Sequence, residues 1–208
     1  MKLVIPTIFA KNKKQFDERF KKLLPVSRDL QIDFMDGKFV RSKSVQIKDI
    51  PNLKNYKNNF EAHIMVSDPE RWISKLKQKG FKKIIFHIET THRPERLIQE
   101  IKKLKIRPVV AINPKTSLDK LPNGVPVLFM GVIPGKEKQA FVPLVYEKIR
   151  SFRQENKRTV IQVDGGASPK NIKKLARLGV DAVNSGSYIS NSDNPKQALN
   201  KLKSLFKE

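Results

Sequence analysis

Two aspartates, Asp33 and Asp164, carry the strongest chemical signal in this chain of 208 residues. Each ends a short apolar run that is typical of a β-strand, and a glycine follows each closely, Gly37 in one case and Gly165 in the other. Carboxylates at the ends of two strands can be directed at one small molecule from opposite sides. That arrangement suits the removal of a proton from one face of a carbon and the delivery of a proton to the other face.

Eight short apolar runs predict the strands that would position these aspartates. Most of the runs are too uniformly apolar to have a solvated face, which is typical of parallel strands that are buried on both sides. The predicted strands span residues 3–6, 30–34, 61–66, 83–87, 108–112, 125–130, 160–163 and 182–184.

Stretches with apolar residues at helical spacing lie between the strands, and we interpret their apolar stripes as the core-facing sides of helices. Asp68, Ser168 and Asn194 each precede a proline and predict helix starts, whereas Gly80 and Gly179 predict helix ends. The stripes are Phe16, Phe20, Leu23 and Leu24; Leu97, Ile98, Ile101 and Leu104; Phe141, Leu144, Val145 and Ile149; and Leu199, Leu202, Leu205 and Phe206.

The repeated strand–helix alternation predicts an α/β fold with one domain over residues 1–208, closed into a (β/α)8 TIM barrel. A doubly wound open sheet is the alternative. That fold normally has a glycine-rich loop after its first strand, where this chain has Thr7-Ile8-Phe9-Ala10 and no glycine.

The chain is strongly basic, with 43 Lys and Arg against 20 Asp and Glu and a formal charge of +23. This charge is compatible with nucleic acid, an anionic membrane or small anionic substrates as partners. The lysines recur on the polar faces of most predicted helices and do not gather in one arm, so we favour a solvated surface and expect no specific nucleic-acid partner.

The absence of cysteine excludes disulfides and thiolate chemistry. No apolar stretch approaches the roughly 18 residues of a membrane span, and we interpret the N-terminal segment as a first strand and not as a signal peptide. We therefore expect a cytoplasmic protein with no membrane partner.

In a barrel of this kind, functional side chains collect at the C-terminal ends of the strands. Gln31 and Asp33 are two residues apart and share one face of a strand, and so do His63 and Met65. Other polar or glycine-containing strand ends are Thr7, His87 with Glu89, Asn113, and residues 131–135, 164–166 and 185–187.

Taken in order, these segments resemble the motifs of the ribulose-phosphate 3-epimerase family over nearly the whole chain. One such match would be weak, but seven in the right order at suitable spacing make a strong case for shared fold and ancestry. The matching segments are Pro6-Thr7-Ile8-Phe9; residues 30–41, with Asp33-Phe34-Met35-Asp36-Gly37; His63-Ile64-Met65-Val66 with Pro69 and Trp72; Phe86-His87-Ile88-Glu89; Asn113-Pro114-Lys115-Thr116; Val163-Asp164-Gly165-Gly166; and Gly186-Ser187.

The resemblance implies an isomerase that epimerises a phosphorylated ketose at C3, most simply D-ribulose 5-phosphate to D-xylulose 5-phosphate, with Asp33 and Asp164 as acid and base. It implies a divalent metal, zinc, iron, manganese or magnesium, that polarises the C2 carbonyl and is held by Gln31, Asp33, His63 and Asp164. Members of the family commonly form homo-oligomers, so we expect one here. The implied substrate-binding residues are Thr7, Met35, His63, Met65, Met130, Gly135, Gly165, Gly166, Gly186 and Ser187.

Two departures from the family pattern matter. Gln31 replaces a metal-binding histidine, and because an amide oxygen is a weaker ligand, the metal is held weakly, is a harder ion or is absent. The loop at residues 134–139 lacks two glycines of the family's phosphate loop, so either Lys136 or Lys138 contacts the phosphate or the loop has opened.

These departures keep open a noncatalytic or retuned relative that binds a phosphorylated ligand. Polyanion binding through the basic surface is a further alternative. Orotidine-phosphate decarboxylase-like chemistry needs an Asp-x-Lys-x-x-Asp array, and residues 33–36 lack that lysine.

Several other polar or aromatic residues have simpler interpretations. We expect Asp36 to cap the turn at Gly37, and His87 to support the site without reacting itself. His92 is expected at the surface, and Trp72 is expected to pack on its own helix.

Overall fold

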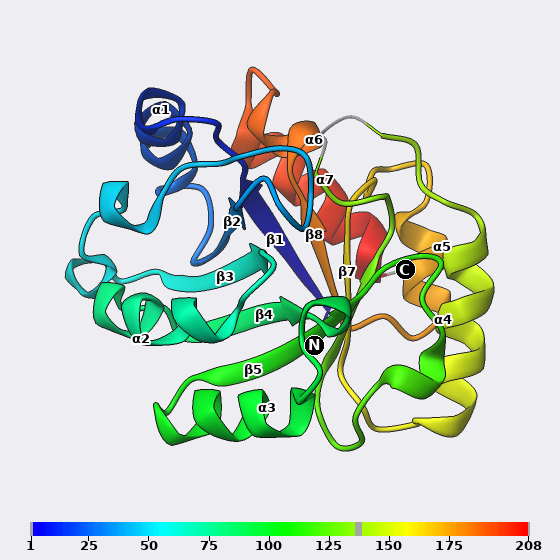
Figure 1. Cartoon of the computed structure of the whole chain (residues 1–208). Coiled ribbons are helices and arrows are strands. Elements are labelled where there is room, and N and C mark those ends of the chain that lie inside the picture. Colours follow the sequence, from blue (N-terminus) through cyan, green and yellow to red (C-terminus); the bar gives the residue numbers. More distant parts are fainter. Residues whose placement is uncertain (1, 136–138, 208) are drawn as a thin grey trace.

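The computed structural model describes residues 2–135 and 139–207 of the chain, and it confirms the predicted (β/α)8 barrel. Eight parallel strands close into a barrel in which each strand pairs with the next and the last pairs with the first, and the helices lie around the outside (Figure 1). The strands are β1 (Leu3–Ile8), β2 (Asp29–Met35), β3 (Asn59–Met65), β4 (Lys83–His87), β5 (Arg107–Ile112), β6 (Val127–Met130), β7 (Ile161–Asp164) and β8 (Ala182–Ser185).

The helices cover the barrel unevenly. The β2–β3 connection contains only the short 3-10 turns Ile47–Asp49 and Leu53–Asn55, and the β5–β6 connection contains only Leu118–Lys120. These segments contain prolines and no helical stripe, so the predicted strand–helix alternation is interrupted at two places. The helices are α1 (Lys13–Leu23), α2 (Glu70–Lys79), α3 (Pro94–Lys103), α4 (Leu144–Glu155), α5 (Ile172–Arg177), α6 (Ser187–Ser190) and α7 (Pro195–Lys207).

Two helix ends follow directly from local sequence. The side chain of Asn194 accepts a hydrogen bond from the backbone N–H of Gln197 and so caps the start of α7. Gly80 ends α2 in the left-handed region, at φ 97°, and its N–H donates to the carbonyl oxygens of Leu76 and Lys77. Both ends were predicted from the sequence.

One predicted helix start is displaced, and one predicted apolar stripe begins before its helix. Ser168 begins a turn, in which its N–H donates to the Asn171 side chain, and α5 starts only at Ile172. Phe141 lies before α4, because Pro143 immediately precedes the first helical residue, Leu144.

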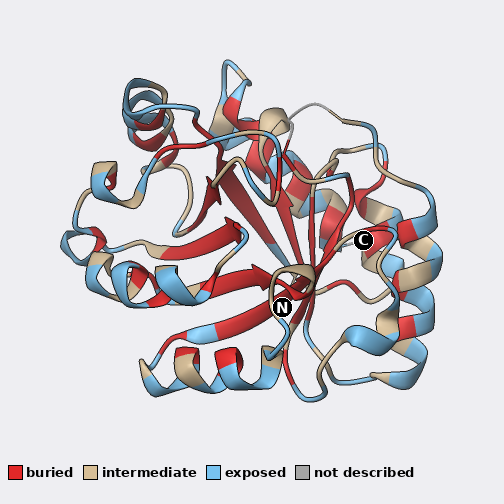
Figure 2. Ribbon diagram, in the orientation of Figure 1, coloured by how far each residue is buried: buried red, intermediate tan, exposed pale blue. Residues whose placement is uncertain are grey.

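The strands are buried on both faces, as the uniform apolar runs predicted (Figure 2). Their outward side chains form one large core with the helices, whereas their inward side chains fill the barrel. The inward set is apolar toward β4, β5 and β6, where Ile85, Val109, Ala111, Leu128 and Met130 form one cluster. Toward β2, β3, β7 and β8 it is polar, and that polar half supports the candidate site. No helix in the described part of the chain is both long and apolar enough to cross a membrane.

Candidate active site

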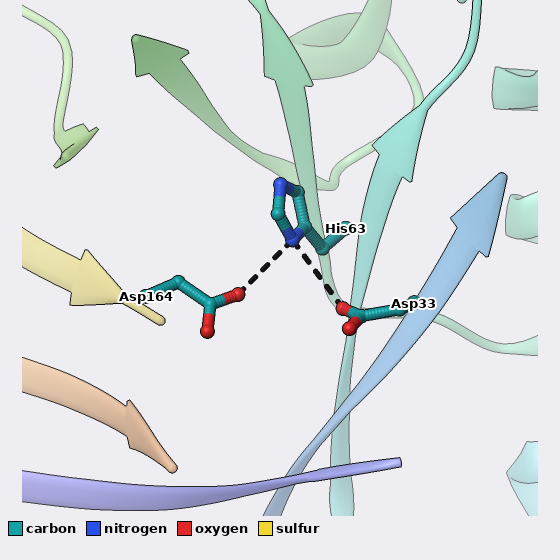
Figure 3. Close-up of side chains that lie close together, drawn as sticks. All are labelled: Asp33, His63 and Asp164. Atoms are coloured by element: carbon teal, nitrogen blue, oxygen red, sulfur yellow. Dashed lines mark ion pairs between the residues drawn. The ribbon is translucent and has the colours of Figure 1, made fainter. Parts of the chain in front are cut away.

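Asp33 and Asp164 meet at the C-terminal mouth of the barrel, although 131 positions separate them in the sequence. Asp33 comes from β2 and Asp164 from β7, and His63 from β3 lies between their carboxylates (Figure 3). The Nδ1 atom of His63 is 3.3 Å from Asp33 Oδ1 and 3.1 Å from Asp164 Oδ2. The geometric prediction that folding brings the two aspartates together at one mouth is therefore confirmed.

The side chain of Gln31 bridges the two carboxylates by hydrogen bonds from the barrel interior. Its side-chain nitrogen donates to Asp33 Oδ1 at 2.9 Å and to Asp164 Oδ2 at 2.6 Å. Its side-chain oxygen points the other way and accepts from Asn184 Nδ2 at 2.7 Å. The expectation was that the Gln31 oxygen would be a metal ligand, but the structure turns the amide nitrogen toward the aspartates.

A second histidine extends the site away from the carboxylates. The Nε2 atoms of His63 and His87 are 3.0 Å apart, so one of them donates to the other. His87 Nδ1 lies 3.3 Å from Glu89 Oε2, and Glu89 also accepts from the backbone N–H of Asn113 at 2.8 Å. Both histidines are fully buried, which agrees with a supporting place for His87 behind His63.

Burial and charge shift the pKa values of this group in different directions. Burial raises the pKa of Asp33 to about 6, against the effect of His63. For His63, burial opposes the charge, but the neighbouring carboxylates of Asp164 and Asp33 outweigh it and raise the pKa to about 10. Burial lowers the pKa of His87. Burial alone would raise the pKa of Glu89, but His87, Thr116 and the Asn113 N–H hold it at about 2.

Asp33, His63 and Asp164 fit a divalent metal. Each offers one ligand atom, and these atoms lie within 4.8 Å of one another. His63 Nδ1 is buried and makes no well-directed hydrogen bond, although both carboxylates are near it. An imidazole nitrogen and two carboxylate oxygens are common ligands of zinc and related ions. With a metal on Nδ1, the Nε2 of His63 would carry the proton and donate to His87, as metal-bound histidines usually do to a partner behind them.

A cavity opens directly above these three residues. Its volume is about 100 Å³, it is partly open to solvent, and all the predicted substrate-binding residues line it. The predicted residues on its wall are Thr7, Met35, His63, Met65, Met130, Gly135, Gly165, Gly166, Gly186 and Ser187. Further residues that were not predicted to bind substrate also line it: Phe9, Val132, Pro134, Gln139, Ala167 and Tyr188.

The turn after β7 needs its glycines. Gly165 and Gly166 have φ angles of 92° and 72°, in the left-handed region that disfavours other residues. A Cβ on Gly165 would also lie 2.4 Å from Val132 Cγ2. The conformation brings the backbone after Asp164 to the wall of the cavity.

The remaining sequence expectations have separate outcomes. Asp36 caps its turn, because it accepts from the N–H groups of Lys38, Phe39 and Ser67. His92 is exposed. Trp72 packs from α2 against Phe34, with ring centroids 5.7 Å apart. The phosphate contacts predicted for Lys136 or Lys138 lie outside the described residues.

Sequence reasoning missed a layer of buried polar residues beneath the site. Its members are Glu61, Gln162 and Asn184, with the Lys83 ammonium at their edge. A signal was present in the sequence: Gln162 and Glu61 each lie two residues before a site residue, Asp164 or His63, and so share its face of the strand. Polar residues at such positions in otherwise apolar strands indicate a buried network.

Comparison with known proteins agrees with this geometry. The profile of the ribulose-phosphate 3 epimerase family matches residues 3–190. A ribulose-phosphate 3-epimerase from Aquifex aeolicus is 31% identical, with 99% of this chain and 97% of that protein covered. The enzyme of the same name from Synechocystis is 30% identical, covering 95% of this chain and 91% of that protein. The chain belongs to the ribulose-phosphate 3-epimerase family. It is therefore an enzyme of the isomerase type, and its relatives include a rice protein described as a cytoplasmic isoform.

More distant solved structures share the fold. A 3-keto-L-gulonate-6-phosphate decarboxylase from Vibrio cholerae superposes with a TM-score of 0.73 at 9% identity, covering 99% of this chain and 97% of that one. For 3-hexulose-6-phosphate synthase from Salmonella typhimurium the TM-score is 0.73 at 15% identity, with 99% and 98% covered. At these identities the likeness shows the barrel fold alone, and the activity must be argued from the site.

Proposed function

We propose that this epimerase-family protein interconverts D-ribulose 5-phosphate and D-xylulose 5-phosphate by moving a proton at C3. The observation that carries the proposal is the placement of two buried carboxylates, from β2 and β7, at the floor of one cavity. Asp33 is 8% exposed and Asp164 is 7% exposed, so each can contact a bound sugar while being shielded from bulk water.

The two aspartates divide the proton transfer. One removes the C3 proton to give an enediolate, and the other returns a proton to the opposite face, with the roles exchanged in the reverse direction. Burial brings the pKa of Asp33 to about 6, near neutral pH, which favours both uptake and release of a proton. Asp33 and Asp164 also contact the same Gln31 nitrogen, which holds them at a fixed separation.

A divalent metal held by Asp33, His63 and Asp164 would supply positive charge near the C2 oxygen of the substrate. The cavity wall offers the complementary groups for the rest of the sugar phosphate. Gly165, Gly166, Gly186 and Ser187 line it, and Met35, Met65 and Met130 add apolar residues to its wall.

The test is an assay of the purified protein with D-ribulose 5-phosphate after metal removal and after addition of zinc, iron, manganese or magnesium. Formation of D-xylulose 5-phosphate is read by a coupled enzymatic reaction. We expect turnover that depends on both aspartates and is increased by at least one of the metals. Absence of epimerisation with every metal, in a protein that still binds the sugar phosphate, would end the proposal.

A retuned relative that binds a phosphorylated ligand is the second candidate, because the Gln31 amide occupies the place of a family metal ligand. The Gln31→His variant separates the two. A large gain in both metal binding and turnover would favour a decayed or retuned site, whereas an unchanged rate in an already active protein would count against it. The expected homo-oligomer and cytoplasmic location stay predictions, and light scattering of the purified protein tests the first.

A further inference from the structure

The orientation of the Gln31 amide is set by a chain of buried hydrogen bonds that begins at an ion pair. The two ends of an amide side chain have the same shape, so only its partners decide which end is the donor. Lys83 can only donate and an ionised Glu61 can only accept, and their side chains are 2.6 Å apart. This pair therefore fixes the direction of every amide that contacts it.

Gln162 is the first of these amides. Its side-chain oxygen accepts from Lys83 Nζ at 3.3 Å, and its nitrogen donates to Glu61 Oε1 at 2.7 Å. The same nitrogen lies 2.6 Å from Asn184 Oδ1, which must therefore be an acceptor. Both contacts with the ion pair agree on one orientation for Gln162.

Asn184 passes this orientation on to Gln31. Its nitrogen donates to Glu61 Oε1 and to Gln31 Oε1, both at 2.7 Å. Because the Gln31 oxygen is occupied in this way, the Gln31 nitrogen faces Asp33 and Asp164. Gln31 and Asn184 are both fully buried, so no water competes for these bonds.

We propose that Asn184 is a positioning residue that locks Gln31 as a hydrogen-bond donor to both catalytic carboxylates. In this orientation Gln31 cannot be a metal ligand. Asn184 is itself held by the Glu61–Lys83 ion pair, through its direct contact with Glu61 and through Gln162. Asp33, His63 and Asp164 would then be the three protein ligands of a metal at this site, and Gln31 would present only N–H groups toward it. The importance of this lock rests on the proposed roles of Asp33 and Asp164, but the orientation itself does not.

Metal binding without substrate tests the orientation independently of the reaction. The probes are Zn²⁺ and Mn²⁺ alone, added to the metal-free protein and followed by calorimetry. The first variant is Gln31→Leu. If Gln31 were a ligand, its loss would remove one donor atom from the metal and weaken binding. The proposal predicts binding at least as tight as that of the unmodified protein.

A reversed network gives the positive test. In the double variant Glu61→Gln with Asn184→Asp, the amide introduced at position 61 can accept from Lys83 and donate to the carboxylate introduced at position 184, and the total charge is unchanged. The Gln162 nitrogen loses its acceptor at position 61 but can still donate to the carboxylate at position 184. The new carboxylate only accepts hydrogen bonds, so Gln31 must turn its nitrogen toward position 184 and its oxygen toward Asp33 and Asp164. We expect Zn²⁺ and Mn²⁺ to bind about tenfold tighter, and we expect the gain to vanish when Gln31→Leu is added. An affinity within twofold of the unmodified protein, or a gain that persists without Gln31, would overturn the proposal.

Measurement on the unmodified protein covers the case in which the double variant does not fold. The NMR signal of the Gln31 side-chain NH₂ is identified by its loss in Gln31→Leu. We expect its hydrogens to exchange with solvent much more slowly than those of exposed glutamines, and to remain protected when Zn²⁺ is added. Exchange as fast as that of exposed glutamines, in the metal-free or in the Zn²⁺-loaded protein, would refute the lock. These results do not depend on whether the protein is active, so they fail separately from the proposed function.

Discussion

Removal of the Glu61 carboxylate should destabilise the barrel interior, because this side chain accepts three hydrogen bonds and the residue is only 5% exposed. Glu61→Leu leaves the Lys83 ammonium, which is 19% exposed at its side chain, without its carboxylate. Breaking a buried ion pair from one side costs about 3–5 kcal/mol. Gln162 and Asn184 each lose one acceptor but keep another partner, so each adds less to the loss of stability than the unpaired Lys83 does.

The expected loss for Glu61→Leu is therefore about 3–5 kcal/mol in the free energy of unfolding, a large part of the roughly 5–15 kcal/mol typical of a domain. Urea denaturation followed by circular dichroism measures it. Adding Lys83→Met removes the stranded charge, so the double variant should recover at least about 1 kcal/mol relative to Glu61→Leu. The control is Glu100→Gln, which breaks an exposed pair with Arg96 and should cost less than about 0.5 kcal/mol. A loss below about 1 kcal/mol for Glu61→Leu would refute the reasoning.

Three further predictions concern acid stability, the turn after β7 and the surface charge. The pKa of Glu89 is about 2 in the folded protein against 4.5 ordinarily, so its contribution is present above pH 4.5 and is lost as the pH falls toward 2. Glu89→Gln should therefore cost on the order of 1–3 kcal/mol near pH 6, and urea titrations should show the difference shrinking at lower pH; a difference that grows in acid would contradict this. Gly165→Ala combines a φ of 92° with a clash against Val132, so we expect a loss of about 1–3 kcal/mol and weaker binding of the sugar phosphate in calorimetry, whereas unchanged values would show that the turn relaxes freely. Binding of duplex DNA, followed by fluorescence anisotropy, should disappear by about 0.15 M salt, and binding that survives would point to a specific nucleic-acid surface.

Much of the fold could be predicted because each strand carries its own signal. The run at β4 was predicted with its observed bounds, Lys83–His87, since the apolar run begins directly after a pair of lysines and a polar histidine ends it. The β2–β3 and β5–β6 connections were harder, because the general pattern of a barrel suggests a helix in each unit. Residues 36–58 instead form a loop that supplies Val40 to the apolar cluster at the cavity, with Phe9, Met35 and Met65.

The sequence was sufficient to predict which residues come together at the site, but not which way the Gln31 amide points. Asp33, His63 and Asp164 could be named from strand-end position and motif, and the structure brings them together. The direction of the Gln31 amide could not be predicted, because it depends on Asn184 from β8 and on Glu61 from β3, which are distant in sequence. Polar residues two positions apart in apolar strands indicate that a buried network exists, but they do not indicate which way each amide in it points.

The central claim is that Asp33 and Asp164 act on opposite faces of one carbon, and isotope exchange in D₂O tests it most directly. Each pentose phosphate is incubated separately with Asp33→Asn and with Asp164→Asn, and deuterium at C3 is read by NMR. We expect neither variant to interconvert the sugars, and we expect each to place deuterium into a different one of the two epimers, because the remaining carboxylate faces only one side. Exchange of the same epimer by both variants, or epimerisation by either, would contradict the two-face mechanism.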